Sequence, residues 1–167
     1  MDSLLHTPEG VRDIYNEECS KKNALSAKLD RILKLYGYKD IQTPTFEFFD
    51  IFNRERGSVP SRNMYKFIDR DGSTLVLRPD ITPSIARAVA KYFKEETIPL
   101  RFSYCGNTFI NNSSLQGKMK ETTQLGAELI GDRDIEGDAE VVALAIHLLL
   151  ESGLTDFQLD IGHVGLF

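Results

Sequence analysis

The segment 109–128 constrains this chain more than any other, because a polar loop within it joins two stretches typical of β-strands. Residues 100–105 and 122–130 are the predicted strands, and residues 110–121 form the loop between them. In the second strand apolar and polar side chains alternate, which is typical of an antiparallel strand with one face in a core. We therefore expect the fold to be built around a hairpin with one polar face.

The polar face of the second strand carries Gln124 and Glu128, which lie four residues apart and therefore project from the same side. Gly126 between them leaves room for a small ligand to approach the backbone. An amide and a carboxylate both accept hydrogen bonds, which suits a ligand with an ammonium or imidazole group. A solvated polar sheet face explains the same alternation, and the pattern alone does not decide between the two.

A second candidate group lies in residues 77–83, where a predicted strand at 74–78 leads into a predicted helix. Thr82 and Pro83 are typical of the N-cap and first residue of a helix. In one interpretation, Asp80 and Thr82 face a shared pocket. In the other, Thr82 caps the helix and Asp80 favours the positive end of its dipole, which is the more usual role at such a junction.

The remaining elements follow from periodicity and turn residues. Apolar residues recur at helical spacing after Asn16, a predicted N-cap, and Gly37 ends that helix. Asp71 and Gly72 are typical of the turn in a β-hairpin, and Arg87 is expected at the surface or in an ion pair. The further predicted elements are a strand at 39–42, hairpin strands at 65–69 and 74–78, helices at 85–93 and 138–151, a mobile loop at 53–63 and a final strand at 157–161.

Composition narrows the functional classes. The 167 residues fit one domain, and an apolar content of 41% with a charged content of 27% is ordinary for a globular protein. The formal charge of −5 provides no general electrostatic attraction for nucleic acid or for an anionic membrane. No stretch approaches the ~18 apolar residues of a membrane span, and the N-terminus lacks the apolar core of a signal peptide. We expect a cytoplasmic protein.

Isolated reactive side chains give little support for further chemistry. Cys19 and Cys105 have neither zinc-ligand nor disulfide spacing, so we expect buried or half-buried free thiols and no metal site. His163 stands alone at a strand end, where histidine is more often structural than catalytic. Lys118 and Lys120 in the polar loop can attract a phosphate, but solvated charges are the simpler interpretation.

Several short motifs occur in the same order as in the histidyl-tRNA synthetase family, and together they resemble it across essentially the whole chain. The resemblance implies an α+β fold, in which a class II aminoacyl-tRNA synthetase-like antiparallel sheet is flanked by helices. Residues 1–167 are expected to form an N-terminal part of that domain, truncated before motif 3; the apolar end at 160–167 fits a fragment, since natural termini are usually polar. The motifs are 7–13 (TPEGVRD), 36–38 (YGY) with Pro44 and Glu47, 64–67 (MYKF) with Asp69, 77–80 (LRPD) with Thr82, 104–109 (YCGNTF) and 124–128 (QLGAE).

The same resemblance implies a ligand and a mode of assembly. In the family, the positions that correspond to Asp80, Thr82, Gln124 and Glu128 contact the amino acid histidine, and all four retain suitable chemistry here. The family also forms a homodimer around motif 1, to which residues 17–47 are expected to contribute.

The hairpin departs from the synthetases at the positions where they bind ATP. Their motif 2 opens Phe-Arg-x-Glu, and the arginine clamps the α-phosphate with planar, charge-assisted bonds. Here Ile110 stands at the arginine position and Asn112 at the glutamate position. Lys118 and Lys120 replace loop arginines, and Thr122 replaces an aromatic residue. We therefore expect adenylation to be lost while the amino-acid pocket is retained.

These departures, together with the tail at 160–167, resemble a non-synthetase branch of the family, the regulatory subunits of short-form ATP phosphoribosyltransferase. The resemblance implies a non-catalytic chain without a cofactor, with histidine as a possible effector, that assembles as a homodimer with the short-form catalytic subunit. That partner condenses ATP with phosphoribosyl pyrophosphate in the first step of histidine biosynthesis, under feedback control by histidine. Two alternatives remain: a histidyl-tRNA synthetase with a degenerate motif 2, and a stand-alone histidine sensor or scaffold.

Overall fold

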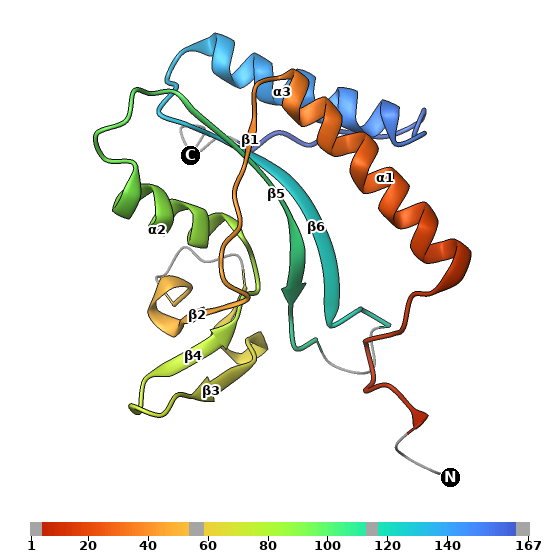
Figure 1. The fold of residues 1–167 in the computed structure, drawn as a ribbon, viewed down its shortest axis with the longest axis vertical. Helices are drawn as coiled ribbons and strands as arrows, with labels where there is room; N and C mark the ends of the chain where they lie inside the picture. The colour runs from red at the N-terminus through yellow and green to blue at the C-terminus, as the bar shows by residue number, and fades with distance from the viewer. Residues whose placement is uncertain (1–4, 54–58, 113–116, 163–167) are drawn as a thin grey trace.

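In the computed structural model, which describes residues 5–53, 59–112 and 117–162, helices lie on both faces of a long curved hairpin (Figure 1). The expected α+β class is confirmed, because helices alternate with mainly antiparallel strands. The elements are α1 (Asn16–Leu35), β1 (Lys39–Asp40), β2 (Phe46–Phe48), the 3-10 helices η2 (Phe49–Ile51) and η3 (Ser61–Asn63), β3 (Lys66–Ile68), β4 (Thr74–Leu77), α2 (Thr82–Tyr92), β5 (Leu100–Phe109), β6 (Glu121–Ile130) and α3 (Ile135–Glu151).

The central hairpin consists of β5 and β6, which pair antiparallel along their whole lengths. The register runs from Leu100 opposite Ile130 to Phe109 opposite Glu121. The first strand is thus longer than the predicted 100–105, because it stays paired with β6 up to the loop. This register sets which side chains of the two strands share a face.

One face of the hairpin packs against α1 and α3, which lie side by side in Figure 1. Leu125 and Ala127 of β6 pack against a buried cluster that includes Leu33 of α1 and Leu144 of α3. Burial of such side chains is the main favourable term in folding. The prediction that the apolar side of the β6 alternation faces a core is confirmed by these contacts.

The opposite face of the hairpin is covered by α2. Ile81, Ile85 and Phe102 form its buried cluster, with Tyr104 and Ile130 packed against them. Phe102 and Tyr104 are two residues apart on β5 and therefore lie on the same face. Phe102 is paired with Glu128, so this face also carries the polar side chains of β6. The polar residues of β6 therefore lie near the start of α2.

A small antiparallel sheet of β2, β4 and β3, in that order, lies beside α2. The predicted hairpin of β3 and β4 is confirmed, with Gly72 in its turn at a φ of 87°. Glu47 of β2 is buried and pairs with Arg87 of α2, with a distance of 2.6 Å between Oε1 and Nη2. The expectation of an ion pair for Arg87 is thereby confirmed.

Strand β1 is shorter than the predicted strand at 39–42. It pairs parallel to β5 at Lys39 and Asp40 only, opposite Phe102 and Ser103. The Ile41 N–H adds one bond to the Ser103 carbonyl at 2.9 Å, after which the chain leaves the edge of β5.

Two predicted helix starts and one predicted strand are wrong. Asn16 does not cap α1: Tyr15 holds the N-cap position without a side-chain bond, and Asn16 adopts a φ of 50°, which asparagine tolerates better than most residues. Helix α3 begins at Ile135, earlier than the predicted 138. Residues 152–162 form no strand, since no described strand pairs with them. Part of the loop predicted at 53–63 lies outside the described residues.

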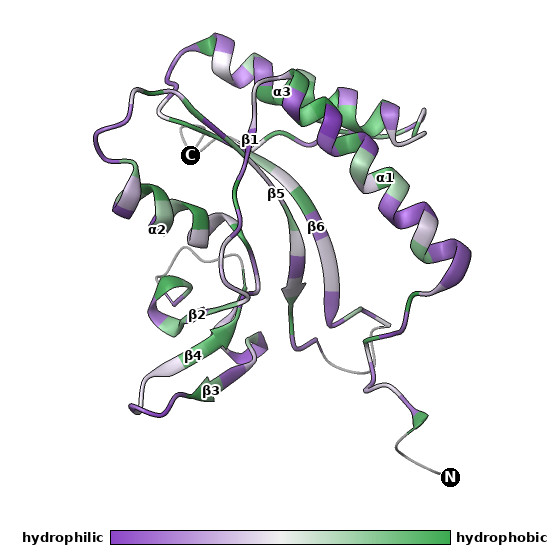
Figure 2. Cartoon of the chain, in the orientation of Figure 1, coloured by the Kyte–Doolittle hydropathy of each residue, from purple (hydrophilic) through white to green (hydrophobic). Residues whose placement is uncertain are grey.

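The hydropathy of α1 agrees with this packing. Its N-terminal half is hydrophilic in Figure 2, and its buried residues, Ile32 and Leu33, lie in its C-terminal half. Within the described ranges, no helix combines the length and apolar character that a membrane crossing requires. Both cysteines are free; Cys19 is half-buried as expected, but Cys105 is exposed, contrary to the prediction.

Candidate functional site

The first residue of α2 and the end of β6 meet at one point, where Thr82 Oγ1 donates a hydrogen bond of 2.7 Å to Glu128 Oε1. The N-cap position of α2 is held by Ile81, so the Thr82 hydroxyl does not cap the helix. The structure thus brings together two of the four predicted ligand contacts, which come from segments far apart in the sequence.

Asp80 takes the role at the helix start that the sequence offered to Thr82. Its Oδ1 accepts hydrogen bonds from the backbone N–H groups of Ile81 at 2.7 Å and Thr82 at 3.4 Å. A carboxylate there also favours the helix dipole. The negative charge of Asp80 acts on Glu128 as well, so the two carboxyl groups are electrostatic neighbours.

Tyr104 is the site residue that sequence reasoning missed. Its hydroxyl interacts with Thr82 and Glu128, and burial raises the pKa of its phenol. Its ring lies directly over Gly126, where a Cβ would overlap the Tyr104 Oη and Cζ atoms. The space predicted above Gly126 for a ligand is therefore filled by Tyr104. The feature that could have revealed Tyr104 is the register of β5 and β6, which places Tyr104 opposite Gly126.

Glu128 has an environment that suits a positively charged or N–H-bearing ligand. Burial raises the pKa of its carboxyl above the ordinary value, and the charge of Asp80 raises it further, while the bond from Thr82 lowers it. No cation of the described residues forms an ion pair with Glu128. A ligand that supplies N–H donors would offset the cost of partly burying a carboxylate that has no cationic partner.

Gln124 lies further along the same face of β6, opposite Gly106. Its side-chain Oε1 is buried and has no hydrogen-bond partner in the described structure. Buried polar atoms are rarely left unpaired, so this acceptor is available to a donor from a ligand. Gln124 thus shares a face with Glu128, as predicted, but lies two cross-strand rows away from the Thr82–Glu128 contact.

The loop end of the hairpin holds its substituted positions through backbone and amide bonds. Ile110 N–H donates to the Lys120 carbonyl at 2.9 Å, and Asn112 Nδ2 donates to the Met119 carbonyl at 3.0 Å. Ile110 offers no charged group, and Asn112 serves to close the loop. Neither side chain provides the clamp that an arginine would give a phosphate.

The other substituted loop positions also have local roles or are solvated. The stem of Lys120 packs on Gly10, where an added Cβ would overlap it. Thr122 Oγ1 lies 3.1 Å from the Thr108 hydroxyl. Lys118 is exposed, which agrees with a solvated charge, whereas His163 lies outside the described residues. Within the described part of the chain, no cluster of His, Cys, Asp or Glu could hold a metal ion.

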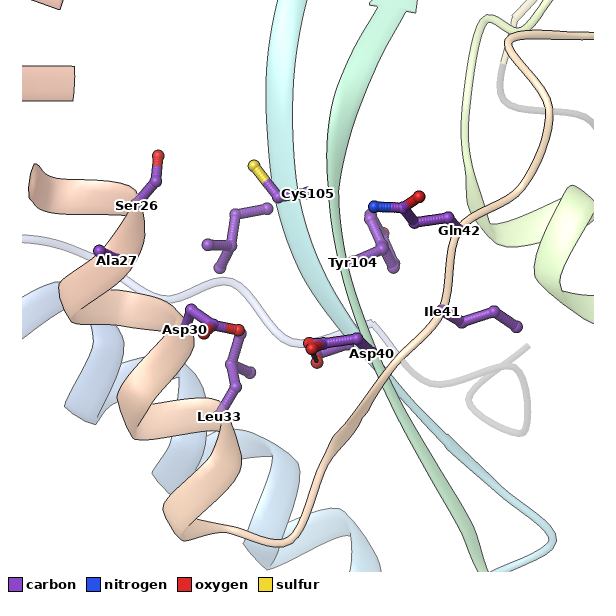
Figure 3. A pocket seen from close by; sticks show the side chains of 11 residues that line it. Ser26, Ala27, Asp30, Leu33, Asp40, Ile41, Gln42, Tyr104 and Cys105 are labelled. Atoms are coloured by element: carbon purple, nitrogen blue, oxygen red, sulfur yellow. Dashed lines mark hydrogen bonds between the residues drawn. The ribbon is translucent and has the colours of Figure 1, made fainter. Parts of the chain in front are cut away.

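Two cavities flank the segment that follows β1. One, of about 280 Å³, lies between α1 and the β1 edge of the sheet and contains Asp30, Asp40 and Cys105 (Figure 3). The other, of about 190 Å³, is lined by Arg78 and Tyr104 among others. Thr82, Gln124 and Glu128 line neither cavity.

The chain is similar to known proteins over nearly all of its length. It is 45% identical over 163 residues to the ATP phosphoribosyltransferase regulatory subunit of Acetivibrio thermocellus, and the match covers 98% of this chain and 39% of that protein. The corresponding subunit of Clostridium novyi is 44% identical over 168 residues, covering 100% of this chain and 40% of that protein.

The chain is also similar to solved structures of proteins with the same or related names. An ATP phosphoribosyltransferase regulatory subunit/histidyl-tRNA synthetase from Bacillus halodurans C matches with a TM-score of 0.83 at 36% identity, over 93% of this chain and 40% of that one. The apo histidyl-tRNA synthetase of S. aureus matches with a TM-score of 0.75 at 31% identity, over 90% of this chain and 35% of that one. The class II synthetase-like fold expected from the motifs is thereby confirmed.

The chain spans about two-fifths of the length of the curated relatives that it matches. The histidyl-tRNA synthetase family profile matches residues 10–167, which is nearly the whole chain. With the motif order, the fold and this match in agreement, the chain belongs to the histidyl-tRNA synthetase family.

Proposed function

We propose that the full-length protein is a non-catalytic regulatory subunit of short-form ATP phosphoribosyltransferase and acts in histidine biosynthesis. The observation that carries this proposal is the match, at 43% to 45% identity over almost the whole chain, to proteins that bear this name. The partner is a short catalytic subunit that joins ATP to phosphoribosyl pyrophosphate. This chain activates that partner and helps to transmit feedback inhibition by histidine.

The hairpin supports a regulatory role in place of adenylation. Ile110 stands where the synthetases place the arginine that clamps the α-phosphate of ATP, and an alkyl side chain forms no charge-assisted bond. Removing that clamp disables activation of an amino acid but does not alter the pocket that binds it. The lysines at 118 and 120 lack the fork geometry that bidentate phosphate binding uses.

Histidine is the effector that the pocket suits. Asp80, Thr82, Gln124 and Glu128 supply acceptors for an ammonium and an imidazole, and Glu128 is a half-buried carboxyl without a cationic partner in the described structure. A pocket that binds histidine differently in two states of a complex shifts the populations of those states. Substituting Glu128 by Ala is expected to abolish histidine binding in this pocket, as measured by calorimetry on the full-length protein.

Assembly completes the proposal. The protein acts in the cytoplasm as a homodimer through the motif 1 region at 17–47, within a hetero-oligomer that contains the catalytic subunit. It needs no cofactor or metal, and neither nucleic acid nor a membrane is a partner.

Sedimentation of the full-length protein with the short catalytic subunit from the same source tests this assembly. A hetero-oligomer is expected, together with no histidine-dependent ATP–pyrophosphate exchange by the full-length protein alone. Exchange at synthetase rates would instead identify a histidyl-tRNA synthetase with a degenerate motif 2, a candidate that the 31% identity to the S. aureus enzyme supports. Histidine binding without assembly or exchange would identify a stand-alone sensor.

A further inference from the structure

A buried cation lies close to the proposed histidine pocket without a counter-charge. Arg78, at the end of β4, is only 8% exposed, and no carboxylate of the described residues forms an ion pair with it. Burial lowers the pKa of its guanidinium, which reports that its charge is poorly solvated. Buried charges are normally paired, so this one has an unmet preference for an anion.

Three backbone carbonyls from two segments of the chain hold the guanidinium in one orientation. Its Nε donates to the Asn107 carbonyl at 2.8 Å, and its Nη1 donates to the Thr43 carbonyl at 2.8 Å and to the Pro44 carbonyl at 3.4 Å. These bonds leave Nη2, for which the described residues provide no acceptor. Nη2 lies over Gly106, where a Cβ would overlap it. The free edge of the guanidinium is thus directed at the ligand face of the hairpin.

The space beside Arg78 is open and polar. A cavity of about 190 Å³ is bounded by Arg78, Tyr104, Gln42 and Thr45. On the hairpin face, Gly106 lies opposite Gln124, whose Oε1 is buried and unpaired. A guanidinium donor without an acceptor and an amide acceptor without a donor are therefore both found at the Gly106–Gln124 pair of the hairpin.

We propose that Arg78 anchors the carboxylate of the amino acid whose N–H donors are accepted by Glu128, an assignment that rests on the proposed function. On this face one row, Tyr104–Gly126, lies between Gly106–Gln124 and Phe102–Glu128, which are four residues apart, about 13 Å of strand at roughly 3.3 Å per residue. The long side chains of Arg78 and Glu128 shorten that gap. The ligand lies against Tyr104 in the intermediate row, with its negative end toward Arg78 and its positive end toward Glu128.

The charges on this face favour a carboxylate over a phosphate, although a guanidinium binds both. Asp80 and Glu128 place two carboxyl groups at the end of this face that is opposite to Arg78. A doubly charged phosphate or a nucleotide tail would be repelled by them, whereas an amino acid presents one negative group and one positive group. The ends of an amino acid thus match the charges of this face.

Calorimetry of the full-length protein with L-histidine and with L-histidinol, in which a neutral alcohol replaces the carboxylate, tests the anchor. Histidine is expected to bind about 30-fold more tightly, in the range of a hydrogen bond to a charged group. In Arg78→Met, histidine affinity should fall to that of histidinol, while histidinol affinity stays unchanged. Arg133→Met, at an exposed arginine, serves as the matched control and should preserve the ratio.

The outcomes separate this inference from the proposed function. Equal affinities of the wild-type protein for histidine and histidinol would overturn the anchor and leave the histidine pocket standing. Absence of histidine binding would overturn the proposed effector and the anchor with it. Because Arg78→Met also removes backbone contacts, equal wild-type affinities for the two ligands would overturn the anchor even where that variant does not fold. Displacement of histidine by millimolar inorganic phosphate would overturn the choice of a carboxylate and point to a phosphate-bearing ligand.

Discussion

Glu128 shows how a residue proposed to bind a ligand lowers the stability of the free protein. Its folded pKa lies above the ordinary 4.5, because burial disfavours the carboxylate. Between these two pKa values the folded state holds more protons than the unfolded state, so stability falls as pH rises through that window and stays lower above it. The carboxylate is kept in a poorly solvated place where a ligand can pair with it.

Replacing Glu128 by Gln is therefore expected to raise the melting temperature at pH 7, because the amide has no charge to bury. Below pH 4.5, where the wild-type carboxyl is also neutral, the gain should vanish. Thermal unfolding at the two pH values measures the effect, with the exposed Glu95→Gln as control. An equal gain at both pH values would contradict this explanation.

Gly126 is required by the ring that lies on it. We expect Gly126→Ala to destabilise the protein by about 1 to 3 kcal/mol, the usual cost of inserting a methyl group into a packed contact. Its Cβ would overlap the phenol of Tyr104. Gly162→Ala, which meets no neighbouring atom, is the control. In denaturant unfolding, a Tyr104→Ala background should remove most of the cost; an unchanged cost would mean that the ring is not the cause.

At the residue scale, sequence periodicity predicted part of this site. The spacing of Gln124 and Glu128 is enough to place them on one face, and the structure agrees. The position of Tyr104 depends on the register of β5 against β6, which a loop of uncertain length does not define. The partner of Thr82 was equally inaccessible, because helix-start chemistry describes only local bonds.

At the scale of elements, α2 is joined to the small sheet by the pair of Glu47 and Arg87. The Glu47 side chain is 6% exposed and that of Arg87 is 28% exposed. Arg87→Met should destabilise the protein by about 2 to 3 kcal/mol, because it leaves a buried carboxylate without its partner. Lys21→Met, which breaks an exposed pair with Glu17, should cost less than about 0.5 kcal/mol in the same urea titration. Similar costs for the two variants would show that the Glu47 pair is not buried in solution.

Elements with strong local signals were predicted well. The two hairpins and α2 follow from turn residues, alternation and a Thr-Pro helix start, and the structure contains all of them. The strand expected at 157–161 failed because alternation describes one strand, whereas a sheet requires a neighbour. Helix α3 begins before its predicted start because local signals define helix ends poorly.

For the whole molecule, the motif order identified the family and the substituted hairpin identified its branch. A synthetase and a regulatory subunit of this family share the fold, so the fold alone does not separate them. We propose that the two differ in the chemistry at Ile110 and at the loop lysines, whereas Thr82 and Glu128 are retained. We therefore expect a protein that binds an amino acid and does not activate it.

The most direct measurement is the rate of phosphoribosyl-ATP formation by the short catalytic subunit, with and without the full-length protein, followed by a histidine titration. We expect the full-length protein to stimulate the rate and histidine to reverse the stimulation. A rate that is unchanged by the full-length protein at every ratio of the two subunits would contradict the regulatory function proposed here.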